Sequence, residues 1–505
     1  MNVLFISLDS LRRDFLGAYA ETPRVTEYDV ETPNLDQFAD RATVFDTHYA
    51  GSLPCMPARR EWLTGTKEFL WRPWGPTEPF DRHLAEVARD NDILSQLITD
   101  HFHYFQHGSH GYYEDFNGFE FVRGNEYDAW KTAPHTPEEE TLDQILNRRS
   151  DPPDSVQYLN RTAYARNTSE FGEEMDYFTP RVFSRATEWL QDNAQWDQWF
   201  CYIDNFDVHE PFDIPEPYAS MYTDEDPDDP ELTSWPYYGP VDEGQSHLSD
   251  RELAFVRSQF AGSVTMVDEW VGRLFDTMTE ESLWDETAVI LTSDHGFALG
   301  DHGYIGKNEF LPYEVIANTP LFVWHPEIET ERTDALTTAV DLYATLLDAL
   351  DIDDESYRHS QSLLPLTTGE REHHREYVMH GYWGSTISVT DGEYSYHCPP
   401  ASDSTTECHS TQMLNPHSWF TPREGRPEAD AGAFLPYTDS MTWRYPARSW
   451  QQHSDERLYD LETDPTQQQN LIDKNTTARD RLRTALSDRL DALGAPESQH
   501  ERLQY

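Results

Sequence analysis

A cysteine at position 55 lies in a segment whose side chains could carry out nucleophilic chemistry. The run Ser52–Arg59 contains Cys55, Pro57 and Arg59 in the pattern Cys-x-Pro-x-Arg. Pro57 restricts the backbone of a turn, and Arg59 would place a positive charge beside a small reactive side chain. The structural alternative is a buried cysteine, because a free cysteine commonly packs as a small apolar residue.

Two other segments end in side chains that could bind a metal ion. Asp294 and His295 follow the apolar run Thr287–Thr292, and Asp9 follows the run Val3–Leu8. A carboxylate and an imidazole are suitable ligands for a divalent cation. The alternatives are a capped turn for Asp294 and His295, and a helix N-cap for Asp9, because aspartate caps helices well.

Two histidines, His101 and His103, could bind an anion together. They are two residues apart, so in an extended segment both side chains lie on the same face. The alternative is a pair of polar residues on the face of a strand.

A third histidine and a lysine add to these candidates. His209 follows the β-rich run Trp199–Ile203 and precedes a proline, which favours a functional role over a structural one, and we expect its neighbour Glu210 to be solvated. Lys307 is one of only four lysines among 37 basic residues. A lysine retained in such a chain indicates a role for an ammonium group, which arginine cannot replace as a proton donor.

The apolar runs before these residues predict strands that position them. Val3–Leu8, Trp199–Ile203 and Thr287–Thr292 are continuous and β-rich, as in parallel strands covered on both faces. Open α/β sheets bind ligands at the carboxyl ends of such strands. Helical spacing predicts helices at residues 93–98, Phe178–Asn193, Glu252–Met278, Val340–Leu347 and Thr476–Leu493.

Two further regions differ from this α/β pattern. From about Tyr377 the chain shows short alternating strands, including Ser385–Thr390 and Glu393–His397. The stretch Val122–Arg166 is rich in polar residues and proline, and we expect it to form a long surface excursion near the mouth of the site.

Together these motifs resemble those of the type I sulfatases. The run Thr32–Gly65, which contains Cys55, is similar to the leading signature of that family, and residues 287–307 are similar to its second motif. The resemblance implies an α/β, alkaline-phosphatase-like fold with a mixed, mostly parallel central sheet flanked by helices. It also implies a catalytic domain at residues 1–375 and a small C-terminal α+β subdomain, an antiparallel sheet with a helix, at residues 376–505.

The resemblance implies a sulfuric ester hydrolase. In that family the motif cysteine, here Cys55, is oxidised by a maturation enzyme to Cα-formylglycine, whose hydrated aldehyde is the nucleophile. The substrate would be a small-molecule or saccharide sulfate ester.

The resemblance also assigns roles to individual residues. One divalent cation, Ca²⁺ with Mn²⁺ or Mg²⁺ as alternatives, would be held by Asp9, residue 55, Asp294 and His295. Catalytic roles would fall to Cys55, Arg59, His103, His209 and Lys307, and substrate binding to His101, His209 and Lys307.

One departure from the family pattern keeps other functions open. Type I sulfatases typically carry two adjacent aspartates after the first strand, whereas this chain has Asp9 followed by Ser10. The related phosphonate monoester hydrolases also carry one aspartate there, so a phosphonate monoester or phosphodiester hydrolase is the alternative. A non-catalytic binding protein would fit if Cys55 stayed a thiol and no metal were bound.

The composition limits the cellular setting and the partners. The formal net charge is −56, from 93 acidic and 37 basic residues, and such a surface repels itself unless salt screens it. We therefore expect a halophilic protein. Nucleic-acid binding is disfavoured because the electrostatic contribution would have the wrong sign.

The amino-terminal segment and the cysteine content also bear on location. The apolar run after Met1 is short and lacks a positively charged start, so we expect a first strand rather than a signal peptide. No apolar segment approaches the roughly 20 residues of a membrane helix, and four cysteines do not form a disulfide framework. We expect a cytoplasmic protein with no membrane partner.

Overall fold

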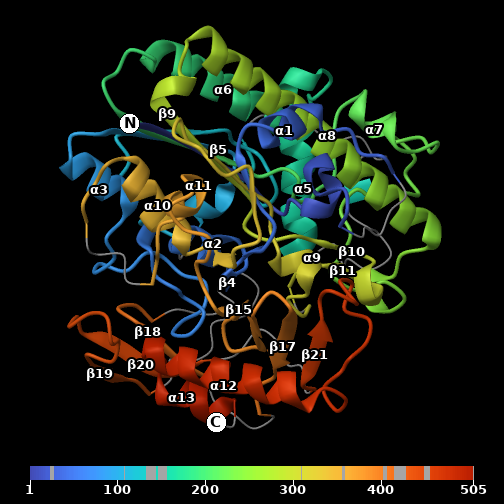
Figure 1. The fold of residues 1–505 in the computed structure, drawn as a ribbon. Helices are drawn as coiled ribbons and strands as arrows, with labels where there is room; N and C mark the ends of the chain where they lie inside the picture. Colours follow the sequence, from blue (N-terminus) through green and yellow to red (C-terminus); the bar gives the residue numbers. More distant parts are fainter. Residues whose placement is uncertain are drawn as a thin grey trace.

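The structure, a computed structural model, describes residues 1–22, 28–106, 109–131, 144–145, 156–308, 310–354, 359–401, 406–413, 428–447 and 455–503. A twisted eight-stranded sheet runs through its larger part (Figure 1). The strands, in order across the sheet, are β13 (Arg332–Thr333), β2 (Thr43–Phe45), β12 (Leu321–Trp324), β9 (Thr287–Thr292), β1 (Asn2–Leu8), β7 (Trp199–Asn205), β5 (Leu94–Thr99) and β6 (Gly118–Phe121).

This sheet confirms the predicted α/β class. Only β12 runs antiparallel to its neighbours β9 and β2, and the other neighbouring pairs are parallel. Alternate residues of β1 enter two different cores: Leu4 and Ile6 on one face, Val3 and Phe5 on the other. Burial on both faces explains why the central strands are continuous apolar runs.

Helices cover both faces of the sheet (Figure 1). The core that contains Leu4 is covered by α1 (Pro33–Ala39), α6 (Phe178–Asn193) and α8 (Asp250–Glu280). The core that contains Phe5 is covered by α2 (Cys55–Thr64), α3 (Leu84–Asp90) and α10 (Asp341–Ala349).

One predicted helix is wrong. Residues 93–98, expected to be helical, contain most of β5, which pairs with β6 and β7. A six-residue apolar run is too short for its spacing to separate helix from strand, and pairing with two neighbouring strands decides the outcome.

The C-terminal part forms a second sheet beneath the first (Figure 1). Its strands are β21 (Arg457–Asp460), β17 (Tyr394–Cys398), β16 (Ile387–Thr390), β15 (Val378–Tyr382) and β4 (Ser52–Leu53). Helix α12 (Thr476–Leu493) packs on β16 and β17. A further sheet contains β18 (Thr406–Ser410), β20 (Thr442–Ala447) and β19 (Asp430–Gly432), and α13 (Glu497–Arg502) follows α12.

The two parts are joined directly before Cys55. Strand β4 lies parallel to β15 of the C-terminal sheet, and helix α2 begins two residues after β4 ends. The domain boundary near residue 375 therefore stays a prediction, since a strand from the first part completes the second sheet.

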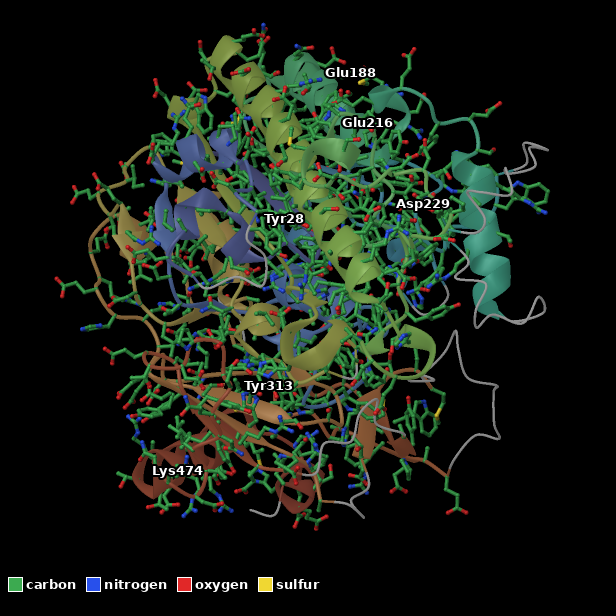
Figure 2. The ribbon with its side chains drawn as sticks, turned by 90° about the vertical axis from the view of Figure 1, so that its right-hand side faces the viewer. Tyr28, Glu188, Glu216, Asp229, Tyr313 and Lys474 are labelled. Carbon is green, nitrogen blue, oxygen red and sulfur yellow. The ribbon has the colours of Figure 1, made fainter. Side chains whose placement is uncertain are left out.

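Glu188 on α6 and Glu216, just before α7 (Tyr218–Met221), are two exposed acidic residues of the larger part (Figure 2). No disulfide joins the four cysteines, all of which lie in described segments. Among the described helices, none has the length and apolar character needed to cross a membrane.

Candidate active site

Three buried carboxylates meet at one edge of the central sheet. Asp9 follows β1, Asp204 is the penultimate residue of β7, and Asp294 lies two residues after β9. All three are fully buried. They converge because β1 is parallel to both β7 and β9, so the carboxyl ends of the three strands meet at the same edge.

Arg59 compensates these three negative charges. Its Nη1 donates to Asp294 Oδ2 at 2.7 Å, its Nη2 to Asp9 Oδ2 at 3.0 Å, and its Nε and Nη2 bind both oxygens of Asp204 at 2.9 and 2.8 Å. Burial by itself would raise the pKa of Asp9, but Lys307 and Arg59 lower it below its ordinary value. Asp9 is therefore held ionised inside the protein.

Cys55 lies directly beside this group. It is the first residue of α2, and Arg59, one turn later, donates from Nη1 to the Cys55 carbonyl at 3.1 Å. The Cys55 Sγ lies 3.3 Å from His295 Nε2 and 3.2 Å from Lys307 Nζ. Burial, followed by the Asp9 charge, raises the pKa of the Cys55 thiol well above its ordinary value.

Lys307 links Cys55 to the first strand. It follows β11 (Tyr304–Gly306), which pairs with β10 (Ala298–Leu299) and β8 (Gly239–Pro240). Its Nζ lies 3.6 Å from Asp9 Oδ1 and donates to Ser10 Oγ at 3.3 Å. Burial would lower the pKa of Lys307, but Cys55 and Asp9 raise it, so the side chain is a fixed positive charge.

The donor set fits a divalent cation. One ligand atom from each of Asp9, Cys55, Asp294 and His295 lies within 4.8 Å of the others. His295 Nδ1 is 2.9 Å from the Gly296 carbonyl, so Nδ1 carries the proton and Nε2 offers a lone pair toward Cys55.

Gly296 is required by the same geometry. A Cβ at this position would lie 1.9 Å from the Val315 carbonyl oxygen. The close approach of the two backbones thus helps to fix the orientation of the neighbouring His295. We call the set Asp9, Cys55, Arg59, Asp204, Asp294, His295 and Lys307 the arginine cluster.

His101 and His103 connect to this cluster through Asp204. His101 Nδ1 lies 3.3 Å from Asp204 Oδ2, and His103 Nδ1 lies 3.0 Å from His101 Nε2. Phe206 stacks on His101 and, at 4.0 Å between ring centroids, on His209. The structure therefore brings all three predicted histidines to the same region, although their roles stay predictions.

Two glutamates beside these histidines were not expected in the site. Glu126 and Glu210 are each 3% exposed, and a ligand atom of each lies within 4.8 Å of one on His209. Glu126 Oε2 also lies 3.6 Å from His103 Nε2. We call His103, Glu126, His209 and Glu210 the glutamate cluster.

The expectations for both glutamates were wrong. Glu210 is not solvated, because Tyr238 donates to its Oε1 at 2.5 Å and the chain folds over it. The start of Val122–Arg166 is not a surface excursion, because Glu126 lies inside the protein and Tyr164 in α5 (Val156–Thr168) is buried. Residues 132–143 and 146–155 of that stretch lie outside the described residues.

Sequence reasoning also missed Asp204 and Ser10. Asp204 could have been found, because it directly follows the predicted strand Trp199–Ile203, at the end where a parallel sheet binds its ligands. Ser10 adopts φ 63°, and its backbone N–H donates to Asp294 Oδ1 at 3.1 Å. Ser10 thus contacts a carboxylate of this donor set through its backbone.

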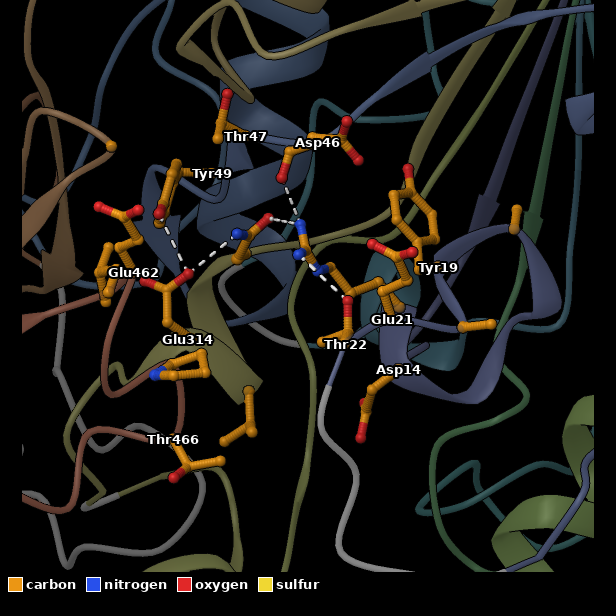
Figure 3. A pocket seen from close by; sticks show the side chains of 18 of the residues that line it. Asp14, Tyr19, Glu21, Thr22, Asp46, Thr47, Tyr49, Glu314, Glu462 and Thr466 are labelled. Atoms are coloured by element: carbon orange, nitrogen blue, oxygen red, sulfur yellow. Dashed lines mark hydrogen bonds between the residues drawn. The ribbon is translucent and has the colours of Figure 1, made fainter.

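A separate cavity of about 790 Å³ contains no residue that the sequence assigned to the site (Figure 3). Arg13 donates to Asn318 Oδ1 at 2.9 Å and to Thr22 Oγ1 at 3.3 Å. Tyr49 and Asn318 both donate to Glu314 Oε2, at 3.0 and 2.9 Å. Polar side chains that line it thus bind one another.

Comparisons with known proteins agree with this geometry. The sequence model of the sulfatase family matches residues 1–352. The chain is 24% identical over 418 residues to an uncharacterized sulfatase of Escherichia coli, which covers 77% of this chain and 76% of that protein.

Two solved structures share the fold. The phosphonate monoester hydrolase of Agrobacterium radiobacter superposes with a TM-score of 0.64 at 20% identity, covering 100% of this chain and 97% of its own. A protein solved in complex with its substrate D-glucosamine-2-N,6-O-disulfate gives 0.63 at 14% identity, covering 97% of each chain. Because the family model spans most of the sequence, the chain belongs to the sulfatase family, whose enzymes hydrolyse sulfate esters.

Proposed function

We propose that this sulfatase cleaves a sulfate monoester with residue 55 in the formylglycine form. The observation that carries the proposal is the position of Cys55, between the metal-capable His295 and the fixed charge of Lys307. The raised pKa of the Cys55 thiol argues against an unmodified thiolate as nucleophile. A formylglycine at this position would supply a hydrated aldehyde, and its formation requires a maturation enzyme.

The divalent cation would be held by Asp9, residue 55, Asp294 and His295. Two carboxylates and an oxygen at residue 55 favour Ca²⁺, and the imidazole keeps Mn²⁺ and Mg²⁺ as alternatives. When bound, the ion would supply Lewis-acid stabilisation of negative charge. Arg59 would keep both carboxylates oriented toward it, since it contacts each of them directly.

The remaining residues would bind the sulfate and the alcohol. Lys307 carries a positive charge 3.2 Å from Cys55 Sγ and would bind a sulfate oxygen. His101, His103 and His209 would surround the ester, and Phe206 holds two of these rings by stacking.

The alcohol of the ester is proposed only as a class. The structural relative bound to a glucosamine disulfate favours a sulfated saccharide over a simple alkyl or aryl ester. The runner-up function, phosphonate monoester or phosphodiester hydrolysis, is favoured by Ser10 in place of a second aspartate and by the Agrobacterium enzyme's fold.

We also propose that the enzyme works in a salt-rich cytoplasm. The support is the net charge of −56, which molar salt would screen over a Debye length of about 3 Å. The unfolding midpoint should then rise steeply when KCl increases. A midpoint independent of salt would contradict this setting.

The decisive experiment combines mass spectrometry with an assay. In protein from its native host, the peptide that contains Cys55 should be about 18 Da lighter than the unmodified peptide, as expected for an aldehyde in place of a thiol. The same sample should hydrolyse sulfate monoesters faster than phosphonate monoesters. An unmodified thiol in active enzyme would overturn the formylglycine proposal, and a preference for phosphonates would establish the runner-up.

A further inference from the structure

The hydrogen bonds of three site histidines fix where their protons lie. Asp204, ionised beside Arg59, can only accept, so His101 Nδ1 carries a proton toward it. His101 Nε2 then has a lone pair, and the proton between the two rings belongs to His103 Nδ1. His209 Nδ1 donates to the Glu210 carbonyl at 2.6 Å. In neutral form, the three Nε2 atoms are therefore acceptors.

Protonation of these rings is disfavoured by their surroundings. All three are buried, and burial lowers the pKa of His101, His103 and His209 below the ordinary histidine value. An alkoxide that leaves from a sulfate ester needs a proton, and these neutral imidazoles have none to offer at Nε2. Lys307 is already engaged with Ser10 and Cys55.

Glu126 has the opposite character. It is 3% exposed, and its Oε2 accepts no hydrogen bond from the residues that the structure describes. That oxygen lies 3.6 Å from His103 Nε2, which is an acceptor. A carboxylate oxygen of Glu126 also lies within 4.8 Å of a ring nitrogen of His209. A buried carboxyl that faces lone pairs is more stable with its proton than without it. Burial and the neighbouring Glu210 raise the pKa of Glu126, in agreement with this geometry.

The backbone holds Glu126 firmly in this position. Its φ is 42°, which is uncommon for a residue other than glycine, and its N–H donates to Asn125 Oδ1 at 2.8 Å. Asn125 Nδ2 in turn donates to Asp100 Oδ2 at 2.7 Å, and the Phe206 N–H donates to the other oxygen of Asp100. The same contacts thus tie Glu126 to the ring that stacks on His101 and His209.

Glu210 has a different role in this arrangement. Its Oε1 accepts the Tyr238 hydroxyl proton, and its backbone carbonyl orients His209. It is therefore a positioning residue for His209 and a natural control for Glu126.

We propose that Glu126 is the acid that protonates the leaving alkoxide, an inference that rests on the proposed sulfate-ester hydrolysis. When the bond between sulfur and the alcohol oxygen breaks, its electron pair stays on that oxygen, which takes the proton of Glu126. The resulting carboxylate regains a proton from water. Once the alcohol has taken that proton, its hydroxyl can donate to His103 or His209, whose Nε2 atoms are acceptors.

The test compares E126Q with wild type on two sulfate esters. An alkyl or sugar sulfate has a poor leaving group and needs an acid, whereas 4-nitrophenyl sulfate releases a stable phenolate and does not. We expect E126Q to lower kcat for the alkyl ester by about 10²–10⁴-fold and for 4-nitrophenyl sulfate by less than about 10-fold, with KM little changed. The shorter acid in E126D should restore part of the activity on the alkyl ester.

The control variant E210Q should affect both esters alike. Equal losses on both esters in E126Q would overturn the proposal, because a merely structural role does not depend on the leaving group. For the alkyl ester, kcat of the wild type should fall at alkaline pH as Glu126 loses its proton, and E126Q should not show this fall. The charged and titratable groups that influence Glu126 are His103, His209, Glu210, Lys307, Asp9 and Arg161.

A second measurement keeps this inference separate from the proposed function. The infrared difference spectrum of wild type minus E126Q at neutral pH should show the carbonyl band of a protonated carboxylic acid. Its absence would overturn the role of Glu126 even in an active sulfatase. If wild type shows the band but hydrolyses only phosphonate esters, the proposed sulfate-ester hydrolysis fails. The role of Glu126 is then tested with an alkyl and a 4-nitrophenyl phosphonate ester in place of the two sulfate esters.

Discussion

In the arginine cluster one guanidinium contacts three buried carboxylates, whereas in the glutamate cluster two buried carboxyls lie beside uncharged imidazoles. The first set is neutralised by charge, through bonds of 2.7 to 3.0 Å to Arg59. In the second, no arginine or lysine of the described segments makes such a contact: the ring nitrogens near Glu126 and Glu210 lie 3.6 and 3.2 Å from their Oε2 atoms. Without a neighbouring cation, a buried carboxyl is lower in free energy in its protonated form than as a carboxylate.

The difference follows from the elements that carry each cluster. Asp9, Asp204 and Asp294 lie at the ends of central strands, and Arg59 lies on α2, so their positions are set by the sheet. Glu126 and Glu210 lie on loops that follow β6 and β7. A rigid set in which one guanidinium balances buried carboxylates suits metal and sulfate binding, and carboxyls that can exchange a proton suit the alcohol.

The largest loss of stability should come from removing the guanidinium of Arg59, which the three carboxylates of the arginine cluster share. Arg59→Met leaves three buried carboxylates without their partner, so the free energy of unfolding should fall by about 3–5 kcal/mol. Denaturant unfolding in high salt measures this loss. Arg59→Lys keeps the charge but not the planar fork and should lose less. If Arg59→Met were as stable as wild type, charge pairing would not be what holds this cluster.

The next prediction is that only the arginine cluster is needed for binding of the divalent cation. Asp294→Asn removes one of the proposed carboxylate ligands, so the enzyme should lose bound divalent cation and about 10³-fold or more in kcat/KM, as should wild type treated with a chelator. Glu210→Gln should keep its metal, because Glu210 belongs to the other cluster. Metal content by elemental analysis checks both. If Asp294→Asn kept its metal and Glu210→Gln lost it, the metal would be bound by the glutamate cluster instead of the arginine cluster.

The arginine cluster was largely predictable from sequence, and the glutamate cluster was not. Asp9, Asp294 and His295 follow apolar strands and Cys55 stands beside a Pro-x-Arg turn, and the resemblance to the sulfatases implied that the four lie together. Asp204 was missed although it directly follows the predicted strand Trp199–Ile203, because His209 was taken as the functional residue after that strand.

Glu126 and Glu210 have no such local pattern. Each is an acidic residue in a polar loop, where solvation is the common outcome. Their burial depends on contacts between distant segments, such as that of Tyr238 with Glu210, which one sequence cannot reveal. The strand at residues 94–99 was missed for a related reason, since its neighbours β6 and β7 decide its conformation.

A smaller effect tests whether Glu210 is neutralised by a proton. Burial raises the pKa of Glu210 from 4.5 to about 7, so the folded state binds the proton more tightly than the unfolded chain. The resulting stabilisation is complete below pH 4.5 and is lost as pH rises through 7. Relative to Glu210→Gln, wild type should lose on the order of 3 kcal/mol between pH 4.5 and 8. Parallel unfolding midpoints across this range would show that Glu210 stays ionised.

The smallest effect concerns the hydrogen bond between the Tyr238 hydroxyl and the Glu210 carboxyl. The Tyr238 hydroxyl donates to Glu210 Oε1 and lowers the pKa of Glu210 by stabilising its ionised form. Tyr238→Phe should therefore cost about 1–2 kcal/mol at pH 8, where Glu210 is charged, and less at pH 5, where it is protonated. Unfolding midpoints at the two pH values measure the difference. An equal loss of stability at pH 5 and pH 8 would mean that Tyr238 acts by packing alone. The protonation of Glu210 would then not depend on the Tyr238 hydroxyl.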